Sequence, residues 1–380
     1  MHRLQLHYTL SRQSSPAQVR NPLIDLLQAV STHGSISAGA RALGLSYRHV
    51  WGELKRWETE LGNELLIWEK GHNARLTEFG SKLMWAESQA QARLAPQIEA
   101  LRSELERAFA VAFDPEAHVV MLYASHDHAL FALREFALAS DAVSAAHARL
   151  HLDMRFSGSL DAIRALNEGR CVMAGFHTLQ SPQQGSVAEK IYKPLLKPGL
   201  HKIIGFASRT QGLMVAAGNP LGLRTMHDVQ SSGARFVNRP LGAGTRVVLD
   251  ELLAQGALPA AQFPGYERTE PSHTAVAHAI ASGAADVGLG IEVAAKAQGL
   301  DFVPLLEESY HLVCLKSALE DPAIVALLDL LKSPAWQAQL SAMPGYHAWH
   351  CGEVQSLRRV LPWWDFARKG RKTPEHAPGS

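Results

Sequence analysis

The stretch that decides the fold is residues 34–58, which read GSISAGARALGLSYRHVWGELKRWE. Small residues come first, Gly44 and Ser46 interrupt the pattern, and aromatic residues then alternate with cations. Glycine ends helices readily and serine begins them, so this stretch predicts two short helices joined by a tight turn. Such a pair is either a plain helical hairpin or a helix-turn-helix, whose second helix enters the major groove of DNA.

The flanking residues complete a small domain. Residues 21–34, NPLIDLLQAVSTHG, start with a proline and carry apolar side chains at helical spacing, which predicts a first helix. Residues 64–80, ELLIWEKGHNARLTEFG, indicate two strands around a glycine turn, which is either a plain surface hairpin or a wing that contacts DNA. We expect a winged helix-turn-helix in residues 1–84.

Hydroxyls, forked donors, an aromatic ring and cations one turn apart are the side chains that contacts with base edges and phosphates require. The expected DNA-binding residues are Ser35, Ser37, Ser46, Tyr47, Arg48, His49, Trp51, Lys55, Arg56, Lys70, His72, Asn73 and Arg75. Packing against the first helix is an equal alternative for Trp51. Val50, Leu54 and Trp57 are expected to hold the reading helix in place.

This region resembles the winged helix-turn-helix of the ModE-type regulators, which are related to the LysR-type regulators. The resemblance covers about residues 20–85, and its features occur in the same order. They are GSIS at 34–37, Ala40, Leu43 and Gly44, SYR at 46–48, and LTEFG at 76–80. The resemblance implies a dimeric transcription factor that binds a pseudo-palindromic site on double-stranded DNA.

Residues 85–113 predict a linker and dimerisation helix. Its apolar residues recur at alternating steps of four and three, which is heptad spacing. They are Leu94, Ile98, Leu101, Leu105 and Ala108. Pro96 is expected to kink or divide the helix. Packing on its own domain is the alternative, but a helix that connects two domains favours a seam between subunits, in a homodimer or a homotetramer.

Residues 114–354 alternate apolar, strand-like runs with helical patterns, as in HVVMLYAS at 118–125 and LDAIRALNEG at 160–169. This alternation predicts parallel sheets with crossover helices, and two successive sets predict two lobes with a ligand cleft between them. The expected fold is therefore an α/β multidomain chain. Residues 355–380 carry cations, proline and glycine, and are expected to form a basic, disordered tail.

The α/β region resembles the periplasmic-binding-protein-like domain (PBP superfamily) found fused to such DNA-binding heads and attached to molybdopterin-biosynthesis proteins. The matching stretches lie at 156–178, 236–253, 273–292 and 343–354. ModE proteins carry small molybdate-binding modules at this point, and this longer region departs from that pattern. The resemblance implies a ligand sensor for molybdate, tungstate or another small oxyanion, in control of molybdenum-enzyme genes.

Ligands of open parallel sheets bind beyond the carboxyl ends of strands, where helices begin. The expected ligand-binding residues are Ser125, His126, Asp127, Ser157, Gly158, Ser159, Arg239, Gly242, Gly244, Thr245, Arg246, Glu292 and Tyr310. Free N–H groups and the positive end of a helix dipole suit an anionic effector. A small carboxylate such as formate would suit His126 and Arg246 as well as an oxyanion does.

Composition and motifs narrow the function classes. The chain has 47% hydrophobic residues, a net charge of +1 and three cysteines far apart, which favours a globular protein of the reducing cytoplasm. No apolar run is long enough to span a membrane. Neither a Gly-x-Ser-x-Gly elbow nor a Walker sequence is present, and the histidines of HDH at 126–128 and HAWHC at 347–351 lack a convincing set of metal ligands.

We therefore expect neither an enzyme nor a bound cofactor, but a DNA-binding regulator with a small anionic effector and no membrane partner. Two other classes stay open. One is an enzyme or a molybdenum-cofactor accessory protein that uses the α/β cleft. The other is a constitutive DNA-binding protein whose α/β region only assembles subunits.

Overall fold

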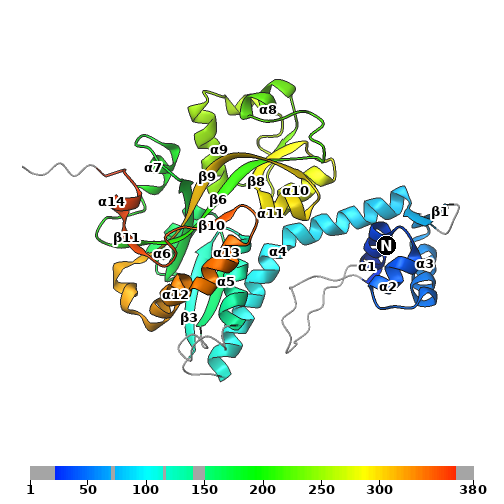
Figure 1. Cartoon of the computed structure of the whole chain (residues 1–380), viewed down its shortest axis with the longest axis horizontal. Helices are drawn as coiled ribbons and strands as arrows, with labels where there is room; N and C mark the ends of the chain where they lie inside the picture. Colours follow the sequence, from blue (N-terminus) through cyan, green and yellow to red (C-terminus); the bar gives the residue numbers. More distant parts are fainter. Residues whose placement is uncertain (1–21, 70–72, 114–116, 140–149, 365–380) are drawn as a thin grey trace, which may run out of the picture.

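The structure is a computed structural model that describes residues 22–69, 73–113, 117–139 and 150–364. Figure 1 shows a small helical head, coloured blue, at one end of a long helix, and a larger α/β domain at its other end. No helix in the described ranges combines the length and the apolar character needed to cross a membrane.

The head has the three helices and the two strands that the sequence predicts. The helices are α1 (Pro22–His33), α2 (Ile36–Ala42) and α3 (Tyr47–Leu61), and the strands are β1 (Leu66–Glu69) and β2 (Asn73–Leu76), which pair antiparallel. The hydroxyl of Ser35 caps α2 and that of Ser46 caps α3, while Gly62 ends α3 in the left-handed conformation. Val50 and Leu54 lie in the core of the head.

A single helix, α4 (Glu78–Phe113), joins the head to the α/β domain. Pro96 lies inside it and does not divide it, although Figure 1 shows that the helix changes direction along its length. The side chains of Leu83 and Met84 pack on the core of the head. The first turns of α4 therefore belong to the head, and the linker is the remainder of the same helix.

The pattern of burial along α4 differs from the predicted heptad seam. The buried residues Ala92, Pro96, Glu99 and Ser103 lie on the face that contacts strand β4 (Leu150–Phe156) and helix α10 (His273–Ala281). The helix thus has an intramolecular partner, contrary to expectation. The predicted heptad lies elsewhere on the helix, and Leu101 in it is 55% exposed. Packing on its own domain therefore applies to one face of α4, and the seam between subunits stays a prediction for the other.

The α/β domain consists of two lobes. The first contains β3 (His118–Ala124), β4 and β5 (Met173–Leu179), with α5 (His128–Ala139), α6 (Ser159–Asn167) and α7 (Val187–Tyr192). The second contains β7 (Phe236–Val237) and β8 (Val287–Ile291), with α8 (Met226–Ser232), α9 (Gly244–Gln255), α10, α11 (Glu292–Ala297) and a short 3-10 turn, Ala260–Gln262. The two-lobed α/β architecture is as predicted.

Two strands of 15 residues, β6 (His201–Val215) and β9 (Asp301–Leu315), run through both lobes. They pair antiparallel with each other, and the sheet order is β4-β3-β5-β9-β6-β8-β7. The expectation of purely parallel sheets is therefore wrong. Parallel pairs occur within each lobe, but the chain passes twice between the lobes, and these crossing strands make the sheet mixed.

After β9 the chain returns to the first lobe. A 3-10 turn (Lys316–Glu320), α12 (Pro322–Lys332) and α13 (Pro334–Ser341) precede β10 (Tyr346–Ala348) and β11 (Val354–Ser356), which both pair with β6. Helix α14 (Leu357–Val360) follows, and Leu357, Leu361 and Trp363 are buried. Residues 355–364 are therefore part of the domain and not of a tail, because their apolar side chains pack on it. Residues 365–380 lie outside the described part.

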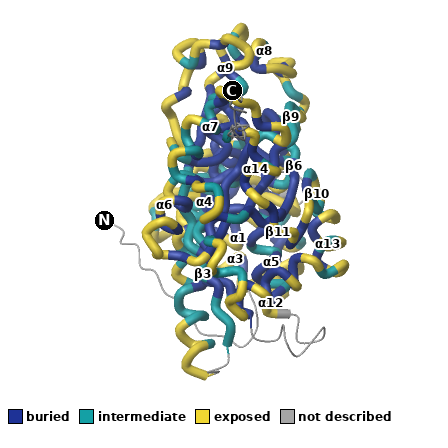
Figure 2. The backbone as a smooth tube through the Cα atoms, turned by 90° about the vertical axis from the view of Figure 1, so that its left-hand side faces the viewer, coloured by how far each residue is buried: buried dark blue, intermediate teal, exposed yellow. Residues whose placement is uncertain are grey.

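The buried residues are concentrated around the strands and the exposed ones on the outer helices, as Figure 2 shows. One hydrophobic cluster combines α5, α12 and α13 of the first lobe with α10 of the second. Two smaller clusters lie one in each lobe. The boundary between the lobes therefore lies against a hydrophobic core that both lobes share.

Candidate functional site

The exposed start of α3 is the first candidate surface. Ser46 accepts a hydrogen bond from the backbone N–H of His49 at 3.2 Å, which fixes where the helix begins. Tyr47, Arg48 and His49 are all exposed. Trp51 is 42% exposed, so its packing alternative is not the one that the structure shows. The four side chains form one exposed surface on the first turn and a half of α3.

The two cations further along α3 are already paired within the helix. The Nζ atom of Lys55 lies 2.6 Å from Glu58, and the guanidinium of Arg56 lies 2.5 Å from Glu53. A DNA phosphate would compete with these carboxylates, so these cations are weaker candidates than Arg48. In α2, Ser35 is engaged as a cap and Ser37 is exposed.

The wing has the predicted hairpin, with Arg75 opposite Ile67 in its ladder. Arg75 is exposed, and Asn73 begins β2. Lys70 and His72, which the sequence places at the tip, lie outside the described residues. The structure therefore supports the position of the wing but not the contacts of its tip.

The second candidate site lies where the two lobes meet. Helices α6 and α9 belong to different lobes, and neither has a side-chain cap at its N-terminus, where Gly158 and Ala243 are the cap residues. The N–H of Leu160 lies 3.4 Å from the carbonyl oxygen of Gly242. A Cβ atom on Gly158 would lie 2.7 Å from that oxygen, so only glycine allows this approach. Two helix N-termini without side-chain caps therefore face the boundary between the lobes.

Arg239, just after β7, is the cation of this boundary. It is 4% exposed, and its Nε and Nη1 atoms have no hydrogen-bond partner among the described residues. Burial lowers the pKa of its guanidinium to about 10, and the nearby Arg209 acts in the same direction. A buried cation without a partner is costly. An anion between the lobes would supply the missing hydrogen-bond acceptors and the missing charge.

Three buried histidines surround Arg239 closely enough to feel its charge: His126, His177 and His273. Burial lowers the pKa of His126 to about 3, with His128 and Arg239 as further causes, and lowers the pKa of the other two well below the ordinary value. The rings are therefore neutral near pH 7. Each can donate one hydrogen bond without adding a charge that would compete with Arg239 for its counter-ion.

Several other buried polar atoms at this boundary also lack a partner in the described part of the chain. They are Ser125 Oγ, His128 Nδ1, Ser157 Oγ, His177 Nε2, Gln211 Oε1, His273 Nδ1 and the hydroxyl of Tyr310. Buried polar groups are nearly always hydrogen-bonded in folded proteins. Orphaned atoms from both lobes therefore mark the place of a small polar ligand or of water.

Three more of the predicted residues, Ser159, Gly244 and Thr245, take part in the packing between the lobes. The ring of His177 stacks on Tyr310 with centroids 3.9 Å apart, and its Nδ1 atom lies 3.4 Å from Ser159 Oγ. A Cβ atom on Gly244 would collide with the same imidazole. Thr245 lies 3.3 Å from His273 and accepts a hydrogen bond from Gln211. Residues of both lobes thus form one buried polar layer, with hydrogen bonds inside each set and a close approach of Gly244 to His177 between them.

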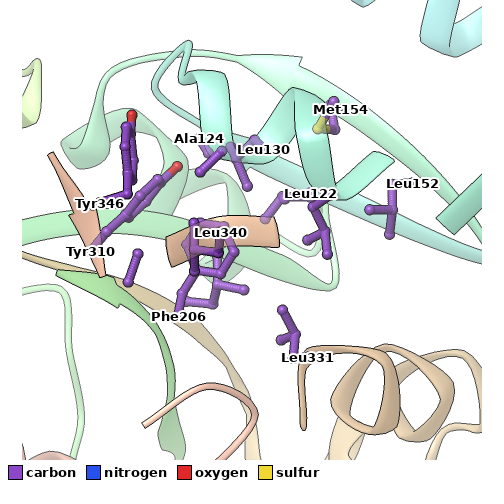
Figure 3. Close-up of a cluster of buried hydrophobic side chains, with 14 of the residues drawn as sticks. Leu122, Ala124, Leu130, Leu152, Met154, Phe206, Tyr310, Leu331, Leu340 and Tyr346 are labelled. Carbon is purple, nitrogen blue, oxygen red and sulfur yellow. The ribbon is translucent and has the colours of Figure 1, made fainter. Parts of the chain in front are cut away.

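A buried ion cluster beneath this layer was not predicted. Arg209 on β6 forms ion pairs with Asp127 and Glu308, and the Tyr346 hydroxyl donates to Asp127 at 2.8 Å. Burial raises the pKa of Glu308. Figure 3 shows the rings of Tyr310 and Tyr346 beside each other at the edge of the hydrophobic cluster. Asp127, which the sequence assigns to the ligand, is therefore occupied as a partner of Arg209.

Two other predicted ligand residues are engaged elsewhere. The Nε atom of Arg246 donates to Asp250 at 3.0 Å, and its guanidinium lies 4.2 Å from the centre of the Tyr266 ring. Glu292 pairs with Lys296 on its own helix at 2.6 Å. Glu292 and the Nε atom of Arg246 thus have their own partners, although Arg246 Nη1 has none among the described residues. The cation whose charge acts on the three histidines is Arg239.

Sequence reasoning missed Arg209, Glu308, His177, Gln211 and His273. The available signal was a polar run between two apolar runs of one strand, as in SRTQ at 208–211 of β6 and EES at 307–309 of β9. Within the described ranges, no group of three His, Cys, Asp or Glu residues is arranged to hold a metal ion.

Comparison with known families gives two matches. The PBP superfamily domain matches residues 140–332, and the bacterial regulatory helix-turn-helix of the lysR family matches residues 23–81. Neither match is to ModE. The matched ranges agree with the two-part architecture and include most of both candidate sites.

Two curated bacterial proteins are similar in sequence. YvgK of Bacillus subtilis is 32% identical over 200 residues, which are 53% of this chain and 64% of that protein. A Clostridium pasteurianum protein encoded in the 5′ region of a 2Fe-2S ferredoxin gene is 31% identical over 109 residues, 28% of this chain and 96% of that protein. The chain therefore spans less than two thirds of the first relative.

Among solved structures, the probable transcriptional regulator PA0477 of Pseudomonas aeruginosa shares 17% identity with a TM-score of 0.40, covering 82% of this chain and 95% of its own. Full-length BenM shares 14% with a TM-score of 0.40, covering 81% and 94%. These scores are too low to compare sites residue by residue.

Proposed function

This chain belongs to the PBP superfamily and carries a helix-turn-helix of the lysR family, and on that premise we propose that it is a DNA-binding transcriptional regulator controlled by a small anion. The observation that supports the anion most directly is the buried guanidinium of Arg239 at the boundary between the lobes, two of whose nitrogen atoms lack a partner among the described residues. Because the proposed regulator acts on DNA, we expect it in the cytoplasm.

The effector we propose is a small oxyanion or carboxylate bound between the lobes. Arg239 would supply charge, the N-termini of α6 and α9 would supply backbone N–H groups, and Ser125, Ser157 and Thr245 would supply hydroxyls. Molybdate, tungstate and formate are compact enough for such a layer of donors. Control of molybdenum-enzyme genes is the finer hypothesis that molybdate would support.

The linker helix offers a route from the lobes to the head, because α4 is attached to both. In the first lobe, Ser103 Oγ donates to the carbonyl of Leu152 at 3.0 Å and accepts from the N–H of Met154 at 2.8 Å. In the second lobe, Arg93 forms two hydrogen bonds to Glu270, at 2.6 and 2.9 Å. A change in the angle between the lobes must therefore strain or move α4.

Glu270 also connects this attachment to the ligand. Its backbone N–H donates at 2.9 Å to the carbonyl of Asn238, the residue before Arg239. An anion that draws Arg239 toward the first lobe would thus displace the residue that holds Arg93. In this mechanism the anion favours one placement of α4, and the shift in DNA affinity is limited by its preference for that placement.

The exposed face of α4 supports a homodimer. Leu94 and Leu101 are exposed while the opposite face is buried, so the helix can hold its own sensor and a second subunit at the same time. Two heads on a paired linker would read a two-fold symmetric operator. Pairing of dimers into a tetramer is a further step of the same proposal.

Arg48→Ala tests the DNA-reading surface. If Arg48 contacts a base edge, the substitution should weaken binding to a site selected from random DNA by about 1–3 kcal/mol and relax the preference at one base position. Fluorescence anisotropy with the selected site and with scrambled DNA measures both effects.

The matched control is Arg56→Ala on the same helix, whose guanidinium is already paired with Glu53. It should have a smaller effect, equal on both DNAs. An equal loss on both DNAs for Arg48→Ala would show that Arg48 contacts a phosphate. Failure of the unmodified chain to bind DNA would contradict the proposal that it is a regulator.

Glu270→Gln tests the route through α4. It removes the charge that faces Arg93, so the effect of the anion on DNA affinity should shrink by about 0.5–2 kcal/mol while the anion still binds. Asp286→Asn, which breaks the exposed pair with Arg235 in the same lobe and away from α4, is the control. Undiminished coupling in Glu270→Gln would exclude this attachment as the route.

A further inference from the structure

A cavity of about 180 Å³ lies in the first lobe, away from the boundary between the lobes. Strands β5 and β9 form one wall through Thr178 and His311, and the chain from β10 to α14 forms the other. The second wall includes Trp349, Gln355 and Arg359. None of them belongs to the site of Arg239.

The two sites lie on opposite faces of the same pair of strands. His177 pairs with Tyr310, and the neighbouring pair is Phe176 with His311. Successive side chains of a strand point to opposite faces. His177 and Tyr310 therefore face the boundary between the lobes, whereas His311 and Thr178 face the cavity. The cavity is a separate site that shares one sheet with the first.

Two buried polar side chains that line the cavity each have a nitrogen atom without a partner among the described residues. His311 is 1% exposed; its Nε2 atom lies 2.9 Å from Thr178 Oγ1, while Nδ1 has no partner. Gln355 is 5% exposed, and its Nε2 atom, a donor, also has no partner. Unpaired buried donors are unfavourable, so a ligand with acceptor atoms would satisfy what the protein leaves open.

The remaining lining is aromatic and cationic. The rings of Trp349 and His311 meet at 72° with centroids 5.4 Å apart, which forms a corner where a planar ring can stack on one and abut the other. Arg359 is exposed on this wall. A cavity of about 150 Å³ suffices for a benzene ring, so this one has the size of a single ring.

We propose that this cavity is a second ligand site, for a planar, single-ring anion with acceptor atoms. The ring lies in the corner of Trp349 and His311, Gln355 Nε2 donates to an acceptor of the ligand, and Arg359 pairs with its negative group. The site goes beyond the anion site between the lobes and does not depend on it, because no residue is shared.

Nicotinate, a pyridine carboxylate, is the probe, and nicotinamide is its uncharged counterpart. Calorimetry on the full chain should show nicotinate binding with a Kd on the order of 1 mM or below, and nicotinamide binding at least about tenfold more weakly. Gln355→Leu should weaken nicotinate about tenfold or more, and Arg359→Gln should remove the preference for nicotinate over nicotinamide. Quenching of tryptophan fluorescence by nicotinate should be largely lost in Trp349→Leu.

Arg239→Met separates the two sites, because it should leave nicotinate binding unchanged. Arg235→Gln, a distant exposed arginine, controls for net charge. The proposal is overturned if nicotinate does not bind the unmodified chain, if Gln355→Leu and Arg359→Gln bind it normally, or if Arg239→Met abolishes its binding. Circular dichroism of each variant shows whether a loss of binding comes from unfolding.

Discussion

Arg239→Met should abolish the stabilisation that a small anion gives to this protein and should not destabilise the chain without the anion. The guanidinium is buried, and two of its nitrogen atoms have no hydrogen-bond partner among the described residues, so its removal relieves the cost of burying them. Replacing buried charged groups by apolar side chains of similar size is often neutral or stabilising, by about 1–4 kcal/mol. Loss of the charge-assisted hydrogen bonds from Arg239 should weaken anion binding by about 2–5 kcal/mol.

Thermal unfolding with and without molybdate, tungstate or formate measures both effects. Arg246→Met is the matched control. Arg246 lies at the start of α9, is as buried as Arg239, and its Nε atom is already paired with Asp250. The variant should keep the response to the anion and should lose stability. An Arg239→Met variant that is still stabilised by the same anion would exclude Arg239 as the anion's partner.

Arg209→Met should destabilise the fold by about 3–5 kcal/mol, because it leaves Asp127 and Glu308 buried without their common cation. The exposed pair of Arg235 and Asp286 gives the comparison, and Arg235→Met should cost less than about 1 kcal/mol. Urea unfolding followed by circular dichroism measures the free energy of unfolding of each variant.

Glu308→Gln sharpens this test. The substitution leaves Arg209 paired with Asp127, and burial already raises the pKa of Glu308, so this variant should lose clearly less stability than Arg209→Met. Equal losses in the two variants, or a loss below about 1 kcal/mol in Arg209→Met, would mean that the ion cluster does not stabilise the fold.

The head could be predicted in detail because its signals are local. Ser35 and Ser46 cap the helices that follow them, and Gly62 ends α3 within the same short stretch. Each of these hydrogen bonds joins residues three or four positions apart. Local chemistry alone could not say whether Trp51 faces solvent, because its neighbours come from the packing of α3 on the rest of the head.

The sequence predicted several of the residues that meet between the lobes, but it did not predict the ion pairs among them. Strand ends gave Ser125, Ser157 and Arg239, because a helix or loop follows a strand there. The sequence could not distinguish Arg239 from Arg246, since the partner of Arg246, Asp250, lies one turn along a helix whose orientation the packing decides. Arg209 and its carboxylates are 82 and 99 positions apart, and only the crossing strands bring them together.

The remaining differences have the same origin. The cations of residues 355–380 suggested a tail, yet Leu357, Leu361 and Trp363 fill a hydrophobic cluster of the first lobe. The heptad of α4 was predicted as a seam between subunits, with packing on its own domain as the alternative, and the sequence did not show which residues make the second face. Ala92, Pro96, Glu99 and Ser103 include two polar residues, which satisfy their hydrogen bonds only in the folded domain.

The affinity of the full chain for its selected DNA site, with and without molybdate, tungstate or formate, tests the central claim most directly. At least one of these anions should change the affinity of the unmodified chain by about fivefold or more, and the same anion should leave the affinity of Arg239→Met unchanged. An affinity that ignores every anion in the unmodified chain, or that responds equally in Arg239→Met, would contradict control of DNA binding by an anion at Arg239.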